Sequence, residues 1–155
     1  MIKVSRMADY AVLLVCKMSK NQDKFYSANE LSLNTSLKTT TINKILTKLT
    51  KANITSSITG GYKLAMGADD ISVGNIIDII DGRVALTVCV EKGENNNCEL
   101  ESVCTSRSNW QVINNAVCNA LNSISIEEMA NPFKIKNNYK YKEDKIFSNI
   151  NNRMV

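Results

Sequence analysis

Apolar residues in the first half of the chain recur with helical spacing, separated by short polar turns. Between residues 39 and 52 they fall at intervals of three, four and seven, the spacing of one buried face on an α-helix. Shorter helices are predicted over residues 9–21 and 28–33, the second starting at a capping-box pattern at Ser27, with a turn at residues 34–36. This order is typical of a helix-turn-helix DNA-binding unit, because its last helix exposes a polar, basic side.

A segment of β-forming residues follows the predicted recognition helix directly. Residues 54–64 contain two short runs around Gly60 and Gly61, which is the pattern of a β-hairpin. A hairpin in this position forms a wing. The predicted fold is therefore mainly α-helical with a small β wing, and a winged helix-turn-helix domain is expected over residues 1–82.

The second half of the chain is predicted to contain further helices and a basic end. Ser72 can cap a short isoleucine-rich helix, and a long helix is predicted over residues 106–123. A small winged domain is too short to cover that helix, so residues 106–131, including a short helix capped by Ser125, are assigned to dimerisation. Residues 132–155 are expected to form a flexible basic tail. The apolar stripe of the long helix consists of Trp110, Ile113, Val117, Ala120, Leu121 and Ile124.

Charge is distributed unevenly along the chain, although the net charge is only +4. Residues 1–65 carry ten Lys or Arg against three acids, residues 66–131 carry three against ten, and residues 132–155 carry six against two. A basic front end suits contact with a polyanion such as DNA. The alternative is a solvated basic face without a partner.

Several functional classes are disfavoured by features that the sequence lacks. No stretch approaches the roughly 18 apolar residues of a membrane helix, and no apolar signal core follows the N-terminal residues. We therefore expect a cytoplasmic protein without a membrane partner. No nucleophile–base pair, P-loop or glycine fingerprint is present, so no enzyme activity is expected.

Three of the five cysteines lie in one predicted loop, residues 83–105, between the winged domain and the long helix. Cys89, Cys98 and Cys104 are thiols of the kind that bind soft metals and iron–sulfur clusters. The paired-cysteine knuckle of structural zinc sites is absent, and the chain contains no histidine. The spacing leaves four possibilities open: an iron–sulfur cluster, a zinc site, a metal-free thiol switch, or incidental exposed cysteines. The remaining cysteines fall in predicted amphipathic helices and are interpreted as packing residues: Cys16 and Cys118.

The polar side of the predicted recognition helix supplies the candidate DNA contacts. Threonine and asparagine can hydrogen bond to base edges, and lysine attracts phosphates. Lys44 and Lys48 lie one turn apart, so one or both should face phosphates. The full candidate set is Lys38, Thr39, Thr40, Thr41, Asn43, Lys44 and Lys48 in the helix, with Gly60, Gly61 and Tyr62 in the wing.

Several short motifs, in this order and spacing, resemble the Rrf2 family of bacterial winged-helix regulators, to which IscR belongs. The later motifs resemble most the branch of that family that regulates the SUF iron–sulfur assembly operon. The resemblance covers about residues 1–131. The motifs are MADYA (residues 7–11), SS (56–57), GGYKL (60–64), ISVGNII (71–77), ALTVC (85–89), CELESVC (98–104), NWQ (109–111) and MA (129–130).

The resemblance implies a homodimer joined through the long helix, with DNA binding that depends on an iron–sulfur cluster. It implies that the three loop cysteines bind this cluster, of the [2Fe-2S] or [4Fe-4S] type. Many relatives place a further ligand, a histidine, where this chain has Arg107. Some relatives use a carboxylate from the first helix of the partner subunit, a position matched by Asp9. Alternatively, Glu99 or Glu101 is the ligand and Asp9 is a helix N-cap.

The wing also departs from the family pattern, because it is shorter than in relatives and carries Thr59 where they often have a basic residue. The expected function is repression of cluster-assembly genes from a roughly palindromic operator when the cluster is present. The alternatives are a nitric-oxide or redox sensor of the same fold, an iron–sulfur carrier that does not bind DNA, and a zinc-stabilised DNA-binding module.

Overall fold

The predicted recognition helix is helix α3 (Thr39–Lys51), and its apolar stripe forms the centre of the domain core. Burial of a large aliphatic side chain contributes roughly 1.5–3 kcal/mol, so this stripe determines which side of α3 faces solvent. The four stripe residues have no exposed surface: Ile42, Ile45, Leu46 and Leu49.

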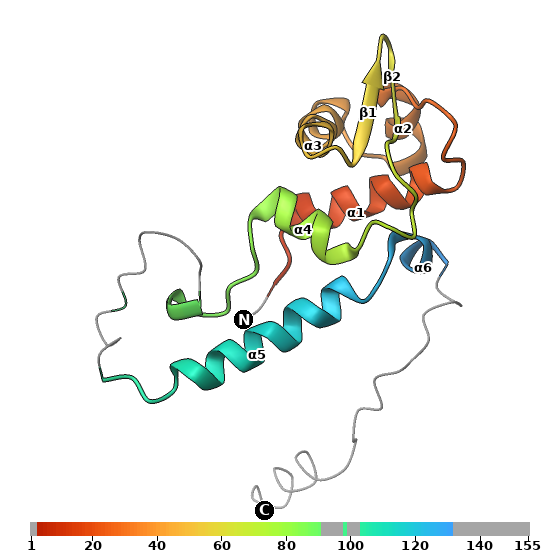
Figure 1. The fold of residues 1–155 in the computed structure, drawn as a ribbon. Coiled ribbons are helices and arrows are strands. Elements are labelled where there is room, and N and C mark those ends of the chain that lie inside the picture. Colours follow the sequence, from red (N-terminus) through yellow and green to blue (C-terminus); the bar gives the residue numbers. More distant parts are fainter. Residues whose placement is uncertain (1–2, 91–97, 99–102, 132–155) are drawn as a thin grey trace, which may run out of the picture.

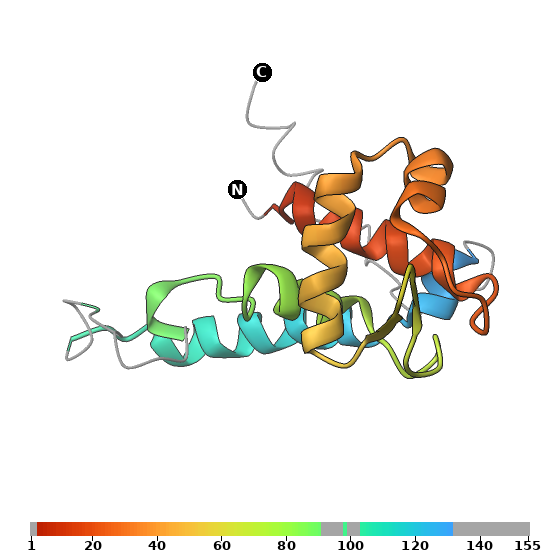
Figure 2. The ribbon, with the colours of Figure 1, turned by 90° about the horizontal axis from the view of Figure 1, so that it is seen from above.

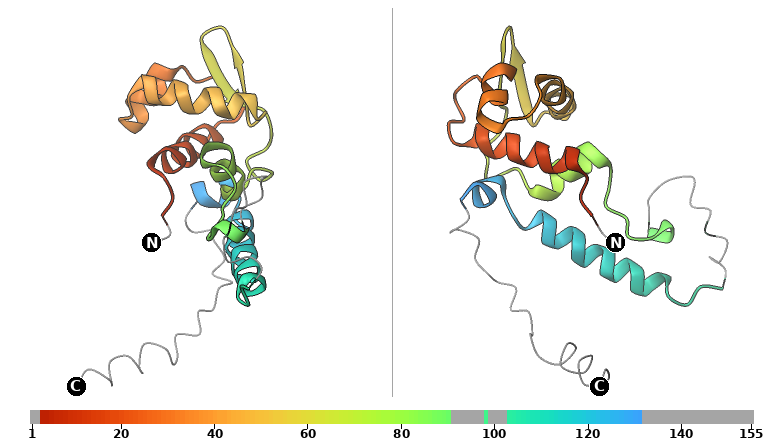
Figure 3. Two further views of the ribbon diagram at one scale, coloured as in Figure 1. Left: turned by 90° about the vertical axis from the view of Figure 1, so that its left-hand side faces the viewer. Right: turned by 180° about the vertical axis from the view of Figure 1, so that it is seen from behind.

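The structure, a computed structural model, describes residues 3–90, 98 and 103–131. Helix α1 crosses the middle of the molecule and contacts α2 and α3 on one side and α4 and α6 on the other (Figures 1 and 3). The elements besides α3 are α1 (Arg6–Ser19), α2 (Ala28–Thr35), β1 (Thr55–Ile58), β2 (Gly61–Leu64), α4 (Val73–Asp81), the 3₁₀ turn η1 (Val88–Val90), α5 (Arg107–Asn122) and α6 (Ile126–Ala130).

The turn between α2 and α3 is held by side chains. Ser36 adopts a left-handed conformation with φ 60°, which ends α2. The Ser32 hydroxyl donates to the carbonyl of Leu37 at 2.6 Å, and the Thr35 hydroxyl accepts from the Leu37 amide at 3.4 Å. The predicted turn therefore lies one or two residues later than expected, because α2 continues through Thr35.

The hairpin behind α3 confirms the predicted wing, with a different turn. Ile58 pairs with Gly61, so the two-residue turn is Thr59–Gly60, and Gly60 takes the positive φ of 90°. The predicted turn at the two glycines is wrong by one residue because Gly61 belongs to β2 and lies buried against Phe25. The described residues thus form a winged helix-turn-helix fold, as predicted.

Helix α1 begins earlier than predicted, at Arg6, and its N-cap is Ser5. The Ser5 hydroxyl accepts from the amide of Ala8 at 3.1 Å, satisfying one of the open donors of the first turn. Asp9 lies inside that turn and is exposed. The alternative interpretation of Asp9 as the N-cap is therefore wrong.

Helices α4 and α5 approach closely, and this contact orients the C-terminal part. A Cβ added at Gly74 would lie 2.2 Å from the side-chain oxygen of Asn122, so only glycine fits there without a shift. The predicted caps at Ser72 and Ser125 are both confirmed as capping boxes. The box at Ser27 is half formed, because the Glu30 carboxylate binds Lys24 instead of the Ser27 amide.

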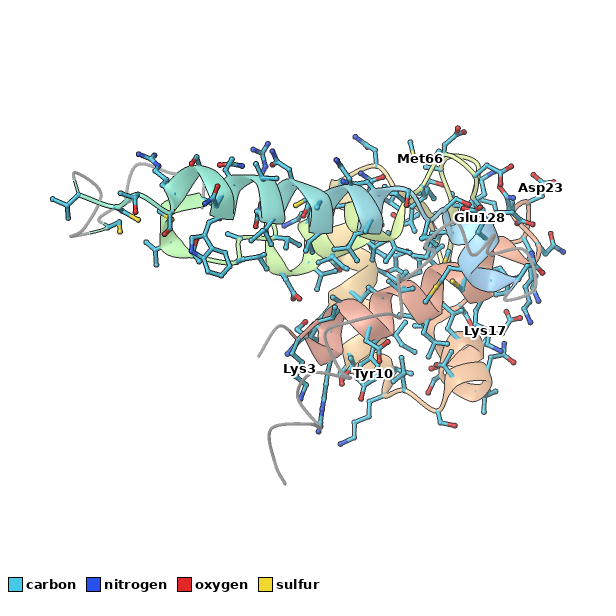
Figure 4. The ribbon with its side chains drawn as sticks, turned by 90° about the horizontal axis from the view of Figure 1, so that it is seen from below. Lys3, Tyr10, Lys17, Asp23, Met66 and Glu128 are labelled. Atoms are coloured by element: carbon cyan, nitrogen blue, oxygen red, sulfur yellow. The ribbon has the colours of Figure 1, made fainter. Side chains whose placement is uncertain are left out.

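The N-terminal half of α5 projects beyond the winged domain (Figures 1 and 2). Figure 4 shows the same feature with side chains: Asp23, Met66 and Glu128 gather at the opposite end of the molecule. Within the ranges that the structure describes, no helix has the length and apolar content needed to cross a bilayer.

Candidate nucleic-acid interface and cysteine segment

The exposed side of α3 carries most of the residues predicted to contact DNA. Thr40, Asn43 and Lys44 are exposed, and Thr39 and Thr41 are half-buried. These side chains occupy the first turns of the helix, the part that enters the major groove in helix-turn-helix proteins. Hydroxyls, an amide and an ammonium are together suited to both base edges and phosphates.

The N-terminus of α3 is suited to an anion. Its N-cap residue is Lys38, which is exposed and makes no side-chain capping hydrogen bond. The first amides of a helix lack intrahelical partners and carry the positive end of the helix dipole. A phosphate oxygen can therefore complete this end, with the Lys38 ammonium nearby.

Lys48 lies one turn after Lys44, but its ammonium is engaged within the domain. Nζ donates to the carbonyl oxygen of Ile80, at the end of α4, over 2.8 Å. Lys44 makes no hydrogen bond or ion pair within the described part of the chain. Of the two lysines predicted to face phosphates, the structure thus leaves Lys44 free to do so.

Of the three wing residues predicted to contact DNA, only Gly60 lies at the exposed tip of the wing. Gly60 is exposed, but Gly61 is buried and Tyr62 is half-buried against the core. Tyr62 also exchanges two backbone hydrogen bonds with Tyr26, at 2.8 and 2.9 Å, which anchors the wing to the domain. The exposed tip consists of Ser57, Ile58, Thr59 and Gly60.

Sequence reasoning missed Ser57 and Ile58, which are exposed because they adjoin the turn at residues 59–60. The tip carries no charge, in line with the noted absence of a basic residue at Thr59. The nearby cation of β2, Lys63, lies over the ring of Phe25 at 5.2 Å from its centroid.

The three loop cysteines are accessible thiols that the described residues do not assemble into one site. Cys89, Cys98 and Cys104 are each half-buried and carry free thiols. Among the described residues, no three Cys, Asp or Glu side chains lie close enough to share a metal ion. The donor set nonetheless fits an iron–sulfur cluster chemically, because three thiols on one segment are the preferred ligand type. The segments 91–97 and 99–102, with Glu99 and Glu101, lie outside the described residues.

Asn114 fastens the start of the cysteine segment to α5, and the sequence analysis did not identify it. Its side chain is 6% exposed, accepts from the amide of Leu86 at 3.0 Å and donates to the carbonyl of Val84 at 3.2 Å. Because the oxygen and the nitrogen of this buried amide are both hydrogen bonded, the contact fixes one arrangement of the segment on α5. The sequence feature that could have indicated Asn114 is its position, as a polar residue beside the apolar stripe of a long helix.

The other two cysteines pack as predicted. Burial raises the pKa of the Cys16 thiol to about 11, so it stays protonated at neutral pH. Cys118 is half-buried on α5, with its sulfur 3.8 Å from the carbonyl oxygen of Val84.

The candidate ligand Asp9 and Arg107, which stands where relatives have a histidine, lie on different helices. Asp9 is exposed on the first turn of α1, and Arg107 is the exposed first residue of α5. The structure does not bring Asp9 together with the three cysteines within one chain. A role for Asp9 as a ligand therefore requires a second subunit, as the resemblance implies.

The predicted stripe on α5 is only partly covered. Trp110 and Ile113, on the projecting half, are 39% and 46% exposed. The other four stripe residues are half-buried: Val117, Ala120, Leu121 and Ile124. An uncovered apolar stripe of this length is typical of an interaction surface.

Comparison with known proteins identifies related regulators. The Rrf2 family, described as an iron-dependent transcriptional regulator, matches residues 4–132. The HTH-type transcriptional regulator IscR of Vibrio cholerae serotype O1 is 30% identical over 91 residues. That match spans 57% of this chain and about half, 51%, of the length of IscR. These relatives are transcriptional regulators and not enzymes.

Two solved structures share the fold. IscR of T. potens superposes with a TM-score of 0.65 at 20% identity, covering 96% of each chain. CymR, the global cysteine regulator of B. subtilis, superposes with a TM-score of 0.66 at 24% identity, covering 84% of this chain and 97% of that one.

Proposed function

Because this chain belongs to the Rrf2 family of iron-dependent transcriptional regulators, we propose that it is a homodimeric repressor that senses iron–sulfur cluster status and controls cluster-assembly genes. The match confirms the resemblance to the Rrf2 family that the sequence motifs indicated. One observation supports the proposal most: the segment with three free thiols joins α4, which contacts the recognition helix, to α5, which carries the uncovered stripe.

Binding to operator DNA uses the exposed side of α3. In a dimer the two α3 helices enter successive major grooves, while Lys38 and the N-terminus of α3 hold a phosphate. The uncharged wing tip adds van der Waals contact without a salt-dependent contribution. Asn43, exposed in the second turn, is the best candidate for base readout, because its amide can form two hydrogen bonds with the major-groove edge of adenine, at N6 and N7.

Replacement of Asn43 by alanine is expected to relax base preference at one operator position, with loss of about 1–3 kcal/mol of discrimination there. The measurement is binding to a set of duplexes that each carry one substituted base pair. Asn29→Ala, at an exposed position of α2, is the matched control and should preserve the preference profile. An unchanged profile in Asn43→Ala would contradict direct readout by this residue.

The residues that would hold the cluster are Cys89, Cys98 and Cys104, with Asp9 of the partner subunit as the fourth ligand. When bound, an iron–sulfur cluster would supply iron sites that tie these side chains together. The chain's own part is to transmit cluster binding to α5. Asn114 holds residues 84–86 on α5, so we expect ligation by Cys89 to act on the position of α5 relative to the winged domain. A coupling of only ~1–3 kcal/mol suffices for regulation.

Asp9→Ala tests the fourth ligand. Since Ser5 is the N-cap, the loss of Asp9 removes only a favourable helix-dipole interaction of about 0.3–1 kcal/mol. As a ligand, however, Asp9 is required for a normal cluster, so the variant should show an altered visible spectrum and a shorter lifetime of that spectrum in air. Asp23→Ala, at an exposed position outside the helices, is the control. A normal spectrum and lifetime in Asp9→Ala would move the assignment to Glu99, Glu101 or an external ligand.

A thiol-based redox regulator of the same fold is the second candidate. The observation in its favour is that the three thiols are free and are not assembled around a metal position within the described residues. The fold shared with CymR is compatible with it. The visible spectrum of anaerobically purified protein separates the two, because thiols and disulfides do not absorb there.

A further inference from the structure

Lys48 is exposed on the recognition helix, but its side chain reaches back to α4 of its own domain. Its ammonium donates to the carbonyl oxygen of Ile80 at 2.8 Å, a contact between residues 32 positions apart. Ile80 lies in the last turn of α4, where carbonyl groups lack intrahelical donors and the helix dipole is negative. The ammonium therefore satisfies a group that the helix leaves open, with a charge of the favourable sign.

The end of α4 that receives Lys48 is itself fixed. Asp81 accepts two hydrogen bonds from Ser5, one from its hydroxyl at 2.6 Å and one from its amide at 3.3 Å. Ser5 in turn caps α1. Lys48 thus ties α3 to a junction of α4 and α1, and that junction cannot move without disturbing three helices.

A second hydrogen bond near the end of α3 connects this helix to the wing. The hydroxyls of Thr50 and Thr55 are 2.8 Å apart, which connects α3 to β1. With Lys48 bound to α4, the C-terminal part of α3 is held from two directions. The exposed residues of its first turns then present a defined angle to the DNA.

We propose that Lys48 is a positioning residue, which fixes the recognition helix on the end of α4, and that it is not a phosphate contact. The proposal rests on the proposed DNA-binding function, and it gives Lys48 a different role from Lys44, which contacts phosphate. Loss of a phosphate contact weakens all sequences alike and lowers the salt slope of binding. Loss of a positioning contact misaligns base readout, so it weakens the specific complex selectively and leaves the salt slope unchanged.

The experiment compares Lys48→Met with Lys44→Met by fluorescence anisotropy over a range of salt concentrations. The probes are a duplex that the wild-type protein selects from a randomised library and a scrambled duplex of the same length and composition. For Lys48→Met we expect about tenfold weaker binding to the selected duplex, which corresponds to the loss of one charged hydrogen bond. Binding to the scrambled duplex should change little, and the salt slope should equal that of the wild type. For Lys44→Met we expect weaker binding to both duplexes and a slope reduced by about 0.9.

Asp81→Ala provides a second variant, because Asp81 is acidic and cannot itself attract phosphate. It should reproduce the Lys48→Met pattern, with selective loss on the selected duplex and an unchanged slope. Circular dichroism at the binding temperature establishes that the variants compared are folded.

A reduced slope with equal losses on both duplexes in Lys48→Met would overturn the proposal in favour of a phosphate contact, and so would unchanged binding to the selected duplex. Failure of the wild-type protein to select any duplex would instead refute the proposed DNA-binding function.

Discussion

Replacing Cys104 by alanine is expected to abolish the visible absorption of protein purified without oxygen, and Cys89→Ala and Cys98→Ala should do the same. The three thiols lie on one segment. Removal of one thiolate ligand exposes an iron site to solvent, so the cluster is lost. The measurement is the visible spectrum together with iron and sulfide analysis of the purified variants.

The matched controls are the two cysteines that lie in helices. Cys16 is protonated at neutral pH, because burial raises its pKa to about 11, and Cys118 contacts the backbone of Val84. Cys16→Ala and Cys118→Ala should both keep the full spectrum. A colourless Cys118→Ala would show that the cluster site has been assigned to the wrong set of thiols, and colour in all three loop variants would contradict cluster binding by the loop.

Conversion of a dimer to a monomer is expected for Ile113→Glu. Ile113 is 46% exposed on the projecting half of α5, next to the exposed Trp110. Each large side chain buried between two such stripes contributes roughly 1.5–3 kcal/mol, and a buried unpaired carboxylate costs several times that benefit. Val117→Glu should act in the same direction, although Val117 is already half-buried within one chain.

The test is sedimentation velocity at several protein concentrations. Asn119→Glu is the matched control, because Asn119 is exposed on the same helix but lies on the side away from Ile113 and Val117. The control should sediment as the wild type does. A dimer that persists in Ile113→Glu would place the interface on another surface.

The parts of the fold that depend on helical periodicity could be predicted from the sequence. The stripe on α3 is buried as its spacing indicated, the predicted box at Ser125 forms completely, and the predicted cap at Ser72 is also a complete box. Such patterns are local, so a single sequence contains them. The hairpin turn was misplaced by one residue, because either glycine could take the positive φ and only the packing of Gly61 against Phe25 decides between them.

The site was less predictable where a side chain finds its partner far along the chain. Asn114 and Lys48 look like ordinary polar positions of amphipathic helices, and their partners lie 28 to 32 residues away. Tertiary contact, and not spacing, gives each its role. The cysteines show the reverse case: the chemistry of the residues suggested the ligand set, while the described residues leave the three thiols apart.

The most direct test of the account is operator affinity in two states of the same protein. One sample is reconstituted with iron and sulfide without oxygen, its visible spectrum recorded, and the other is stripped with a chelator and kept reduced. Both are titrated against the duplex selected by the wild-type protein at one fixed salt concentration. The account predicts that the cluster-containing form binds roughly 5 to 150 times more tightly, the range of a 1–3 kcal/mol coupling. Equal affinities of the two forms would contradict it.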